Sequence, residues 1–403
     1  MKLDIFCELQ KAQESWTDDH EHKLIQETLE QARLADELGY NCWWEVEHHA
    51  AGIFSHSSAP EIMLTTIANQ TKNLRVGHAA VLAPFNFNHP IRVAERTAFI
   101  DQISEGRLEV GLARSTLPEW RLFDIDPDES RSQMQETFEM LPKMWTEEEF
   151  SWDSKNFQID KRNIVPKPYQ KPHPNLWQAT ATPSGFEQAG RNGVGALLTT
   201  VSFPIEAVAS MLEIYREEIQ NCDPVGKFVN DQVALFTFVH CAETEQEAID
   251  NGAAAAAAWY TNTVADFFEI RDTMLKAGDE MAAAVKANPD GLLAEFAKMQ
   301  EEAAANVAET DFTRLLNRIL AGEHISNEEA YEILSEHDTV IIGDVETCKK
   351  KMKRYEEIGL DRLMCFQQVG NLDPEAIKKS IRLVGEHLIP VFDPDATPAG
   401  ASA

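Results

Sequence analysis

The sequence is poor in basic residues and has no long apolar run. Its 36 lysines and arginines are outnumbered by 67 aspartates and glutamates, which gives a net charge of −31 over 403 residues. Such an acidic surface repels the phosphates of nucleic acids and of anionic lipids, so we expect neither as a partner. No apolar run approaches the roughly 18 residues of a transmembrane helix, and we therefore expect no membrane span.

Paired cysteines, an apolar leader and a glycine-rich dinucleotide motif are also missing. The six cysteines form no C-x-x-C pair, which counts against a zinc knuckle or a dithiol motif. Asp4 and Glu8 interrupt the first ten residues, so we expect no signal peptide and a cytoplasmic location with reduced thiols. The first turn lacks G-x-G-x-x-G, which weakens a Rossmann interpretation.

Short apolar runs alternate with segments of helical periodicity along most of the chain. Eight runs are expected strands: Lys2–Cys7, Tyr40–Val46, Leu74–Leu82, Arg107–Leu112, Asn175–Ala179, Val194–Val201, Gln232–His240 and Leu360–Gln367. A ninth, Thr339–Ile342, we interpret as the approach to the following helix. This alternation predicts an α/β fold with a parallel sheet. Eight strands favour a closed barrel, although the count alone does not exclude an open doubly wound sheet.

Helix boundaries and composition divide the rest of the chain. Apolar residues of Glu21–Leu38 share one helical face, and Gly39 should end that helix. Residues 243–338 are rich in alanine and acidic, which predicts a helical insertion between strands seven and eight, serving either as packing bulk or as a lid over the barrel mouth. We expect residues 1–390 to form one domain and residues 391–403 a flexible tail.

A glutamate and two histidines, Glu47–His49, follow the second expected strand, at the edge where barrels place active sites. His48 could transfer a proton near neutral pH, or the histidines could make structural hydrogen bonds only. Other histidines, His56, His78 and His89, are available as metal ligands. Together with His48 and His49, these histidines show no His-x-His or His-x-x-x-His spacing. We therefore expect no metal site.

Two features at neighbouring strand ends suit a phosphate. Arg114 follows the fourth expected strand, where its guanidinium could grip a phosphate or form a salt bridge at the rim. The turn Ala179–Gly185 leads into a helix near Pro183, and it could bind an anion or simply cap that helix through Thr182. A phosphate between the two would be held from both sides.

Small residues occupy the later half of the third expected strand, at Gly77–Ala80. They either leave room for a flat ring or form a tightly packed corner. Gly111, within the fourth strand, permits close approach of the backbone.

Taken in order, these motifs resemble the bacterial-luciferase-like monooxygenase family. The resemblance is carried by Glu47–His49, Leu74–Ala80, His89–Pro90, Ile100–Arg107, Gly111–Arg114, Ala181–Ser184, Ile342–Thr347 and Tyr355–Gly359. It covers about residues 1–205 and 339–390, while the alanine-rich middle matches poorly. It implies a (β/α)8 TIM barrel with an insertion after strand seven.

The resemblance also implies a function. The cofactor would be reduced FMN supplied by a separate flavin reductase, and dioxygen would form a peroxyflavin that oxygenates a small organic substrate. The family resemblance suggests a homodimer. Two alternatives are a deazaflavin-dependent hydride-transfer oxidoreductase and a flavin-binding protein without catalysis.

By the same resemblance, His48 is the catalytic histidine and Arg114 grips the FMN phosphate, with Thr182, Ser184 and Gly185 completing that contact. Ala79 and Ala80 correspond to a pair beside the flavin ring that is joined by a cis peptide. Ala113 stands where luciferases carry a reactive cysteine, which counts against light emission. Phe85–Asn88 and Trp120 also differ, and we expect them to line a substrate pocket of another shape.

Overall fold

A closed barrel of parallel strands forms the centre of the computed structural model, which describes residues 1–199, 205–269 and 311–399. The barrel strands are β1 (Lys2–Cys7), β2 (Cys42–Glu45), β3 (Arg75–Leu82), β4 (Leu108–Ala113), β7 (Asn175–Ala179), β8 (Gly195–Thr199), β9 (Val233–Ala242) and β11 (Arg362–Phe366). They neighbour one another in that order, and both β8–β9 and β11–β1 pairs close the ring. The (β/α)8 TIM barrel expected from the sequence is confirmed.

Two parts of the sheet structure differ from the sequence-based expectation. The run at Thr339–Ile342 does not merely approach a helix, because Ile341–Asp344 forms a strand, β10, that pairs in parallel with β9. An antiparallel hairpin of β5 (Phe150–Asp153) and β6 (Gln158–Arg162) was not anticipated. Its strands are mostly exposed, so they lack the buried apolar run that marks the barrel strands.

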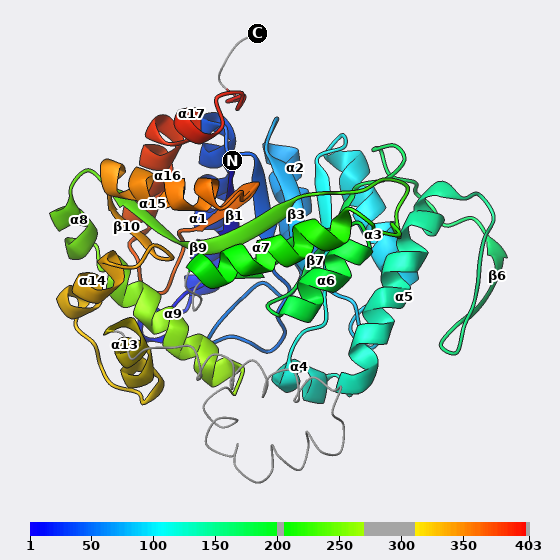
Figure 1. The fold of residues 1–403 in the computed structure, drawn as a ribbon, viewed down its shortest axis with the longest axis horizontal. Coiled ribbons are helices and arrows are strands. Elements are labelled where there is room, and N and C mark those ends of the chain that lie inside the picture. The colour runs from blue at the N-terminus through cyan, green and yellow to red at the C-terminus, as the bar shows by residue number, and fades with distance from the viewer. Residues whose placement is uncertain (200–204, 270–310, 400–403) are drawn as a thin grey trace.

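Helices surround the barrel, as Figure 1 shows. Those on the first part of the chain are α1 (His20–Leu38), α2 (Pro60–Gln70), α3 (Pro90–Ile103), α4 (Leu117–Leu122), α5 (Pro127–Thr146), α6 (Pro183–Arg191) and α7 (Ile205–Ile219). Helix α1 ends as expected, since Gly39 adopts φ +88° and its N–H donates to the carbonyl of Ala35.

The described part of the expected insertion is mostly helical. It contains α8 (Glu245–Asp250), α9 (Ala253–Phe267), α13 (Asp311–Leu320) and α14 (Asn327–Ser335), between β9 and β10. Residues 270–310 of the expected insertion lie outside the described residues. Helices α4 and α9 lie at one end of the barrel, and α17 (Ile389–Phe392) lies at the other (Figure 1).

The last part of the chain packs on the barrel. Helices α15 (Val345–Glu357) and α16 (Pro374–His387) flank β11, and α17 runs into the segment expected to be a tail. Beyond it, the N–H of Ala399 donates to the carbonyl of Asp36 at 3.0 Å, and the Asn73 side chain donates to the carbonyl of Thr397. The boundary expected at residue 391 therefore falls within a helix, and residues 397–399 make defined contacts.

Thiols and membrane propensity follow expectation within the described ranges. All six cysteines are free, and five of them are buried. Among the described helices, none combines the length and apolarity needed to cross a bilayer.

Candidate functional site

Most of the expected site residues lie on one sector of the barrel rim. Strands β2, β3, β4 and β7 are consecutive neighbours in the ring and run in parallel, so their carboxyl ends share that rim. The register pairs Leu82 with Ala113 and Leu112 with Gln178. Arg114 and the turn after Ala179 are therefore adjacent strand ends, while His48 follows β2 on the other side of β3.

His48 is held by a carboxylate that sequence reasoning missed. Its Nδ1 lies 3.3 Å from Oε2 of Glu119, a buried residue on the short helix α4. The same carboxylate accepts hydrogen bonds from the His49 N–H at 2.7 Å and the Ser115 hydroxyl at 2.5 Å. The only sequence signal for Glu119 is its place just after Arg114, since it lies 71 residues from His48.

The charge state of Glu119 fixes how it orients the histidine ring. Burial would raise its pKa, but the hydrogen bonds from His48, Ser115 and the His49 N–H lower it below its usual value. An ionised carboxylate only accepts hydrogen bonds, so Nδ1 of a neutral His48 carries the hydrogen and Nε2 carries the lone pair. Nε2 is thus the ring atom available for proton transfer.

Glu47 and His49 anchor the same loop to the neighbouring strand. Glu47 accepts hydrogen bonds from the Leu82 N–H at 2.8 Å and from the Asn88 side chain at 2.9 Å. It also lies 3.1 Å from Nε2 of His49, and this contact raises the pKa of His49 above its usual value. Glu47 and His49 therefore have the structural role that the sequence left open, which leaves His48 as the proton-transfer candidate of the pair.

Aromatic rings surround His48, and two of them come from the insertion. The His48 ring centroid lies 5.1 Å from that of Phe54 and 5.9 Å from those of Phe267 and Phe268. Phe267 is the last residue of α9. The insertion thus covers the loop that carries His48, which favours the lid over the packing-bulk interpretation.

Arg114 follows β4 directly, as expected, and a tryptophan fixes its backbone. The indole N–H of Trp120 donates to the Arg114 carbonyl at 2.5 Å, and Trp120 is 1% exposed. We expected Trp120 to line a substrate pocket, but this buried contact makes it a support for the strand end that carries Arg114.

The turn before α6 has the capping role considered for it. Thr182 caps the helix, because its hydroxyl accepts from the Gly185 N–H at 3.2 Å and lies 3.3 Å from the Ser184 hydroxyl. A Cβ at Gly185 would come within 1.7 Å of the Thr180 hydroxyl oxygen, so only glycine fits. The Gly185 N–H serves the cap, and the missing side chain lets Thr180 pack against the turn.

The Ala79–Ala80 peptide is cis, as the resemblance implied. A Cβ at Gly111 would lie 2.4 Å from the carbonyl oxygen of His78 and 3.3 Å from the Ala80 Cβ, so this glycine lets β4 approach β3 closely. Gly77 is packed against the ring of Trp44. The motif is therefore a packed corner at Gly77, whereas Ala79 is only partly buried.

A second polar group at the rim was not expected. Glu8, just after β1, accepts from the Tyr260 hydroxyl at 3.2 Å and from the Gln10 side chain at 2.9 Å. Burial raises the pKa of Glu8 well above its usual value and that of Glu45 to about 7. Oε1 of Gln10 and Oε1 of Glu45 are buried without a hydrogen-bond partner. Tyr260 lies on α9, so the insertion reaches this group too.

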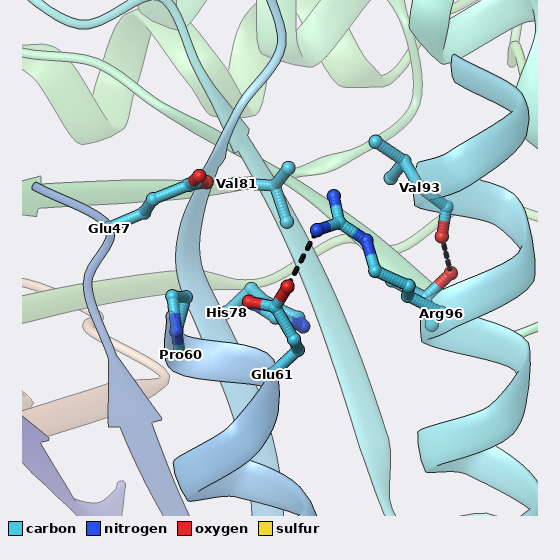
Figure 2. Close-up of a pocket in the computed structure, with 8 residues that line it drawn as sticks. Glu47, Pro60, Glu61, His78, Val81, Val93 and Arg96 are labelled. Carbon is cyan, nitrogen blue, oxygen red and sulfur yellow. Dashed lines mark hydrogen bonds and ion pairs between the residues drawn. The ribbon is translucent and has the colours of Figure 1, made fainter. Parts of the chain in front are cut away.

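A cavity of about 230 Å³ lies between β3, α2 and α3. Figure 2 shows Glu61 of α2 facing Arg96 of α3 across it, at 2.6 Å, with His78 of β3 beside them. Both ring nitrogens of His78 lack hydrogen-bond partners among the described residues, and burial lowers its pKa to about 4. Side chains fill most of this space, so it does not suit a flavin.

Comparison with known proteins adds to this geometry. The family described as luciferase-like monooxygenase matches residues 1–362. The oxygenase component of a flavin-dependent trigonelline monooxygenase from Acinetobacter baylyi is 26% identical over 251 residues, covering 62% of this chain and 67% of the relative. Limonene 1,2-monooxygenase from Rhodococcus erythropolis is 25% identical over 285 residues, covering 69% and 72%.

Solved structures share the fold over nearly the whole chain. The oxygenating constituent of 3,6-diketocamphane monooxygenase from Pseudomonas putida, in complex with FMN, has a TM-score of 0.69 at 17% identity and covers 97% of this chain and 98% of that one. The coenzyme F420-dependent tetrahydromethanopterin reductase of Methanopyrus kandleri has a TM-score of 0.62 at 15% identity, covering 97% and 99%. At these identities the likeness concerns the fold.

Proposed function

Because the chain belongs to the luciferase-like monooxygenase family, we propose that it is the oxygenase of a two-component, FMN-dependent system. It would use reduced FMN and dioxygen to oxygenate a small organic substrate, by way of the peroxyflavin that the family resemblance implies. The observation that carries the proposal is the oriented His48–Glu119 pair on the same rim sector as Arg114 and the Thr182 turn.

The phosphate of FMN would lie between Arg114 and the turn Thr182–Gly185. The arginine offers a planar fork of N–H donors, and the amino end of α6 adds hydroxyls from Thr182 and Ser184 with the favourable end of the helix dipole. Gly185 keeps this turn compact, because any side chain there would collide with Thr180.

The isoalloxazine ring would lie against Ala79 and Ala80, between the phosphate site and His48. Small side chains let a flat ring approach the strand backbone, and Gly111 keeps the neighbouring strand from narrowing this space. Reduced FMN supplies the electrons that activate dioxygen.

His48 would hold or move a proton through Nε2, because Glu119 occupies Nδ1. The rings of Phe54, Phe267 and Phe268 around it would exclude bulk water, which otherwise delivers protons without control. The chain's own residues therefore provide one directed proton-transfer group in an apolar surrounding.

The partners follow from the same proposal. The trigonelline relative is named as an oxygenase component, and this supports a separate flavin reductase as the source of reduced FMN. The homodimer and the cytoplasmic location stay predictions. The buried Glu8–Tyr260 group supports a substrate with a polar function beside an apolar body.

A deazaflavin-dependent hydride transfer is the second candidate, favoured by the fold neighbour that uses coenzyme F420. Such an enzyme would turn over without dioxygen. A flavin-binding protein without catalysis is less well supported, since storage of a flavin would not need the oriented His48–Glu119 pair.

The test mixes the protein, loaded with reduced FMN or with a reduced deazaflavin, with oxygenated and with anaerobic buffer. We expect an oxygenated flavin spectrum that persists with FMN, and faster peroxide release in His48→Ala than in the parent. His387→Ala, which removes an exposed histidine of α16, is the control and should behave as the parent. Equal peroxide release in parent and His48→Ala would refute the role of His48, and turnover only with the deazaflavin would favour the second candidate.

A further inference from the structure

Two histidines and a glutamate meet at the barrel rim outside the flavin sector. His20 and Glu21 begin α1, and His56 lies in the loop between β2 and α2. One ligand atom from each of the three residues lies within 4.8 Å of the others. The two histidines are 36 positions apart in the sequence, and packing of the β1–α1 segment on the β2–α2 loop brings them together.

Contacts with backbone carbonyls favour a tautomer of both imidazole rings that leaves Nε2 free to bind a metal. Nδ1 of His20 lies 2.6 Å from the carbonyl oxygen of Thr17, and Nδ1 of His56 lies 3.1 Å from that of Leu9. A carbonyl only accepts, so each neutral ring carries its hydrogen on Nδ1 and a lone pair on Nε2. This outer contact, from Nδ1–H to a backbone carbonyl, accompanies most histidine ligands of metals.

The unused nitrogen of His20 is a second, independent sign of a ligand. Its Nε2 is buried and has no hydrogen-bond partner among the described residues. The ring itself is held in place, since it stacks on Trp16 with centroids 4.7 Å apart, and Trp16 also meets the His56 ring edge-on at 5.6 Å. This stacking holds the ring in place, so its buried Nε2 keeps an unused lone pair.

We propose that His20, Glu21 and His56 bind a divalent transition-metal ion, with zinc as the preferred occupant. Two imidazole nitrogens and one carboxylate form a known zinc ligand set that leaves a fourth position for water. Magnesium and calcium prefer oxygen ligands and would be disfavoured. With metal–ligand distances of about 2.1 Å, the ligand atoms must approach one another more closely than in the metal-free arrangement, and the exposed Glu21 side chain is free to do so.

This proposal departs from the expectation of no metal, which considered His56 but not His20. Its ion would join the segment after β1 to the loop after β2. That loop also carries Phe54, which packs on His48, and Ser55, whose hydroxyl donates to the Glu8 carbonyl at 2.7 Å. Occupancy would therefore stiffen the wall beside the proposed proton-transfer residue without contacting the flavin.

Titration calorimetry of the metal-free full-length chain with zinc chloride tests the proposal, independently of any flavin chemistry. We expect one zinc site in the parent, and affinity lower by at least about tenfold in His20→Ala and in His56→Ala. Glu21→Gln should also weaken binding, and as an exposed position it should leave the fold intact. The matched control is His22→Ala, an exposed histidine of the same helix, which should bind as the parent.

Two further readouts keep the outcome clear. Zinc should raise the thermal unfolding midpoint of the parent and of His22→Ala, since a ligand that binds only the folded chain stabilises it, but not of Glu21→Gln. Cobalt should give the visible absorption of a four-coordinate ion in the parent and in His22→Ala, but not in Glu21→Gln. The proposal is overturned if the parent binds no zinc, or if Glu21→Gln and His56→Ala bind as tightly as the parent.

Discussion

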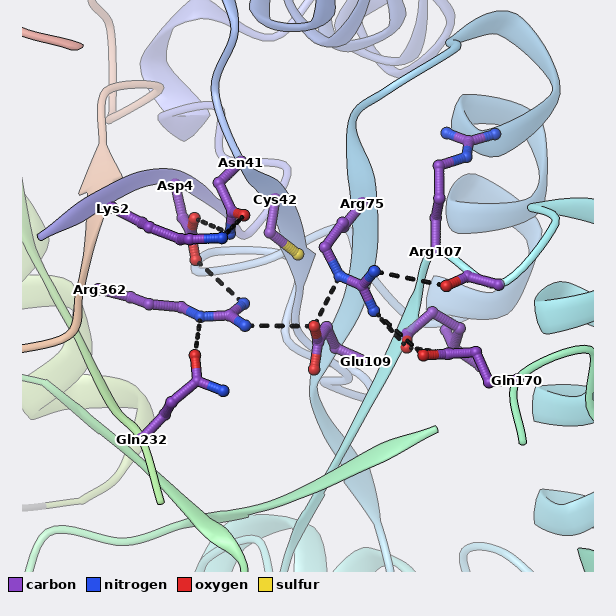
Figure 3. Close-up of polar contacts among 12 residues, drawn as sticks. Lys2, Asp4, Asn41, Cys42, Arg75, Arg107, Glu109, Gln170, Gln232 and Arg362 are labelled. Carbon is purple, nitrogen blue, oxygen red and sulfur yellow. Dashed lines mark hydrogen bonds and ion pairs between the residues drawn. The ribbon is translucent and has the colours of Figure 1, made fainter. Parts of the chain in front are cut away.

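The pKa values of two buried glutamates in the same barrel are shifted in opposite directions. Glu109 of β4 lies towards the amino ends of the strands, where it accepts from Arg75 at 2.7 Å, from Arg362 at 3.3 Å and from the Trp177 indole at 2.7 Å. Burial would raise its pKa, but the two guanidinium groups lower it to about 2. Figure 3 shows Glu109 between these arginines, with Asp4 on the far side of Arg362.

Among the described residues, Glu45 at the carboxyl end of β2 has no such cation. It accepts from the Trp43 indole at 2.9 Å, and its other oxygen has no hydrogen-bond partner among those residues. Burial therefore raises its pKa to about 7, although Trp43, Ser57 and Cys7 oppose the shift. Burial also raises the pKa of the nearby Glu8.

The difference distinguishes the amino end of the barrel, where Glu109 has two cationic partners, from the carboxyl end, where Glu45 has none among the described residues. At the amino end, arginines and hydrogen-bond donors surround the buried carboxylate, and even Asp4, whose pKa burial raises, has donors in Trp44 and Asn41. At the carboxyl end, the described residues leave buried polar atoms of Gln10 and Glu45 without partners. Unsatisfied groups are costly to keep, and barrels place their active sites at this end.

The largest effect should come from breaking the amino-end network. Arg362→Met removes the cation shared by Glu109 and Asp4, and also its contact with the Trp177 ring at 4.8 Å. Loss of one partner leaves buried charge uncompensated, so we expect the free energy of unfolding to fall by about 3–5 kcal/mol in urea titrations. A loss below about 1 kcal/mol, the usual value for a surface pair, would contradict the stabilising role of this end.

At the other end, the expected effect is on binding. Arg114→Ala should weaken reduced-FMN binding by about 1.5–3 kcal/mol, the usual loss for a charge-assisted contact. Stability should change little, because Trp120 holds the strand end through the Arg114 carbonyl, which the substitution keeps. The dissociation constant measured under anaerobic conditions checks this, and an unchanged value would remove Arg114 from the phosphate site.

The two glutamates should give stability profiles of opposite sign. Between its ordinary pKa of 4.5 and about 7, Glu45 is protonated in the folded chain and ionised in the unfolded one. Its contribution to stability is therefore present below pH 4.5 and is lost as the pH rises to about 7, by up to about 1.4 kcal/mol per pH unit. Glu45→Gln should flatten unfolding free energies over this window.

Glu109→Gln is the matched comparison for that experiment. Since the folded pKa of Glu109 is about 2, its stabilisation is present above pH 4.5 and is lost as the pH falls towards 2. The substitution should change the acid side of the profile and leave the slope between pH 4.5 and 7 alone. Identical profiles for the two variants would mean that their surroundings do not differ as described.

The smallest effect should come from a pair that belongs to neither end. Arg191 and Glu218 lie 2.8 Å apart, but the arginine side chain is 61% exposed. Arg191→Met should leave the urea midpoint unchanged within error, because water screens an exposed ion pair. A loss comparable to that of Arg362→Met would show that burial does not distinguish the two arginines.

The barrel itself was predictable because buried parallel strands are continuous apolar runs. β1 and β7 have the predicted bounds, and the other barrel strands begin or end within two residues of the predicted ones wherever they are described. β10 was not predicted as a strand because its apolar run is only a few residues long. The hairpin of β5 and β6 was not predicted because it is exposed and has no such run. The ends of helices were also predictable from local sequence. Thr182 caps α6, and Gly39 ends α1.

Contacts between distant segments were not predictable. Glu109 and Arg362 are 253 residues apart, Tyr260 and Glu8 are 252 apart, and nothing in either local sequence indicates its partner. Glu119 was not predicted for the same reason, although its carboxylate lies beside Nδ1 of His48 and orients the ring. The sequence thus indicates which residues end the strands, while closure of the barrel decides which of them meet.

A crystal structure of the protein with bound FMN tests the central claim most directly. We predict the phosphate between the Arg114 guanidinium and the Thr182–Gly185 turn, with the ring against Ala79–Ala80 and its reactive edge facing His48. A phosphate bound at any other sector of the rim, or a ring on the far side of the barrel from His48, would contradict it.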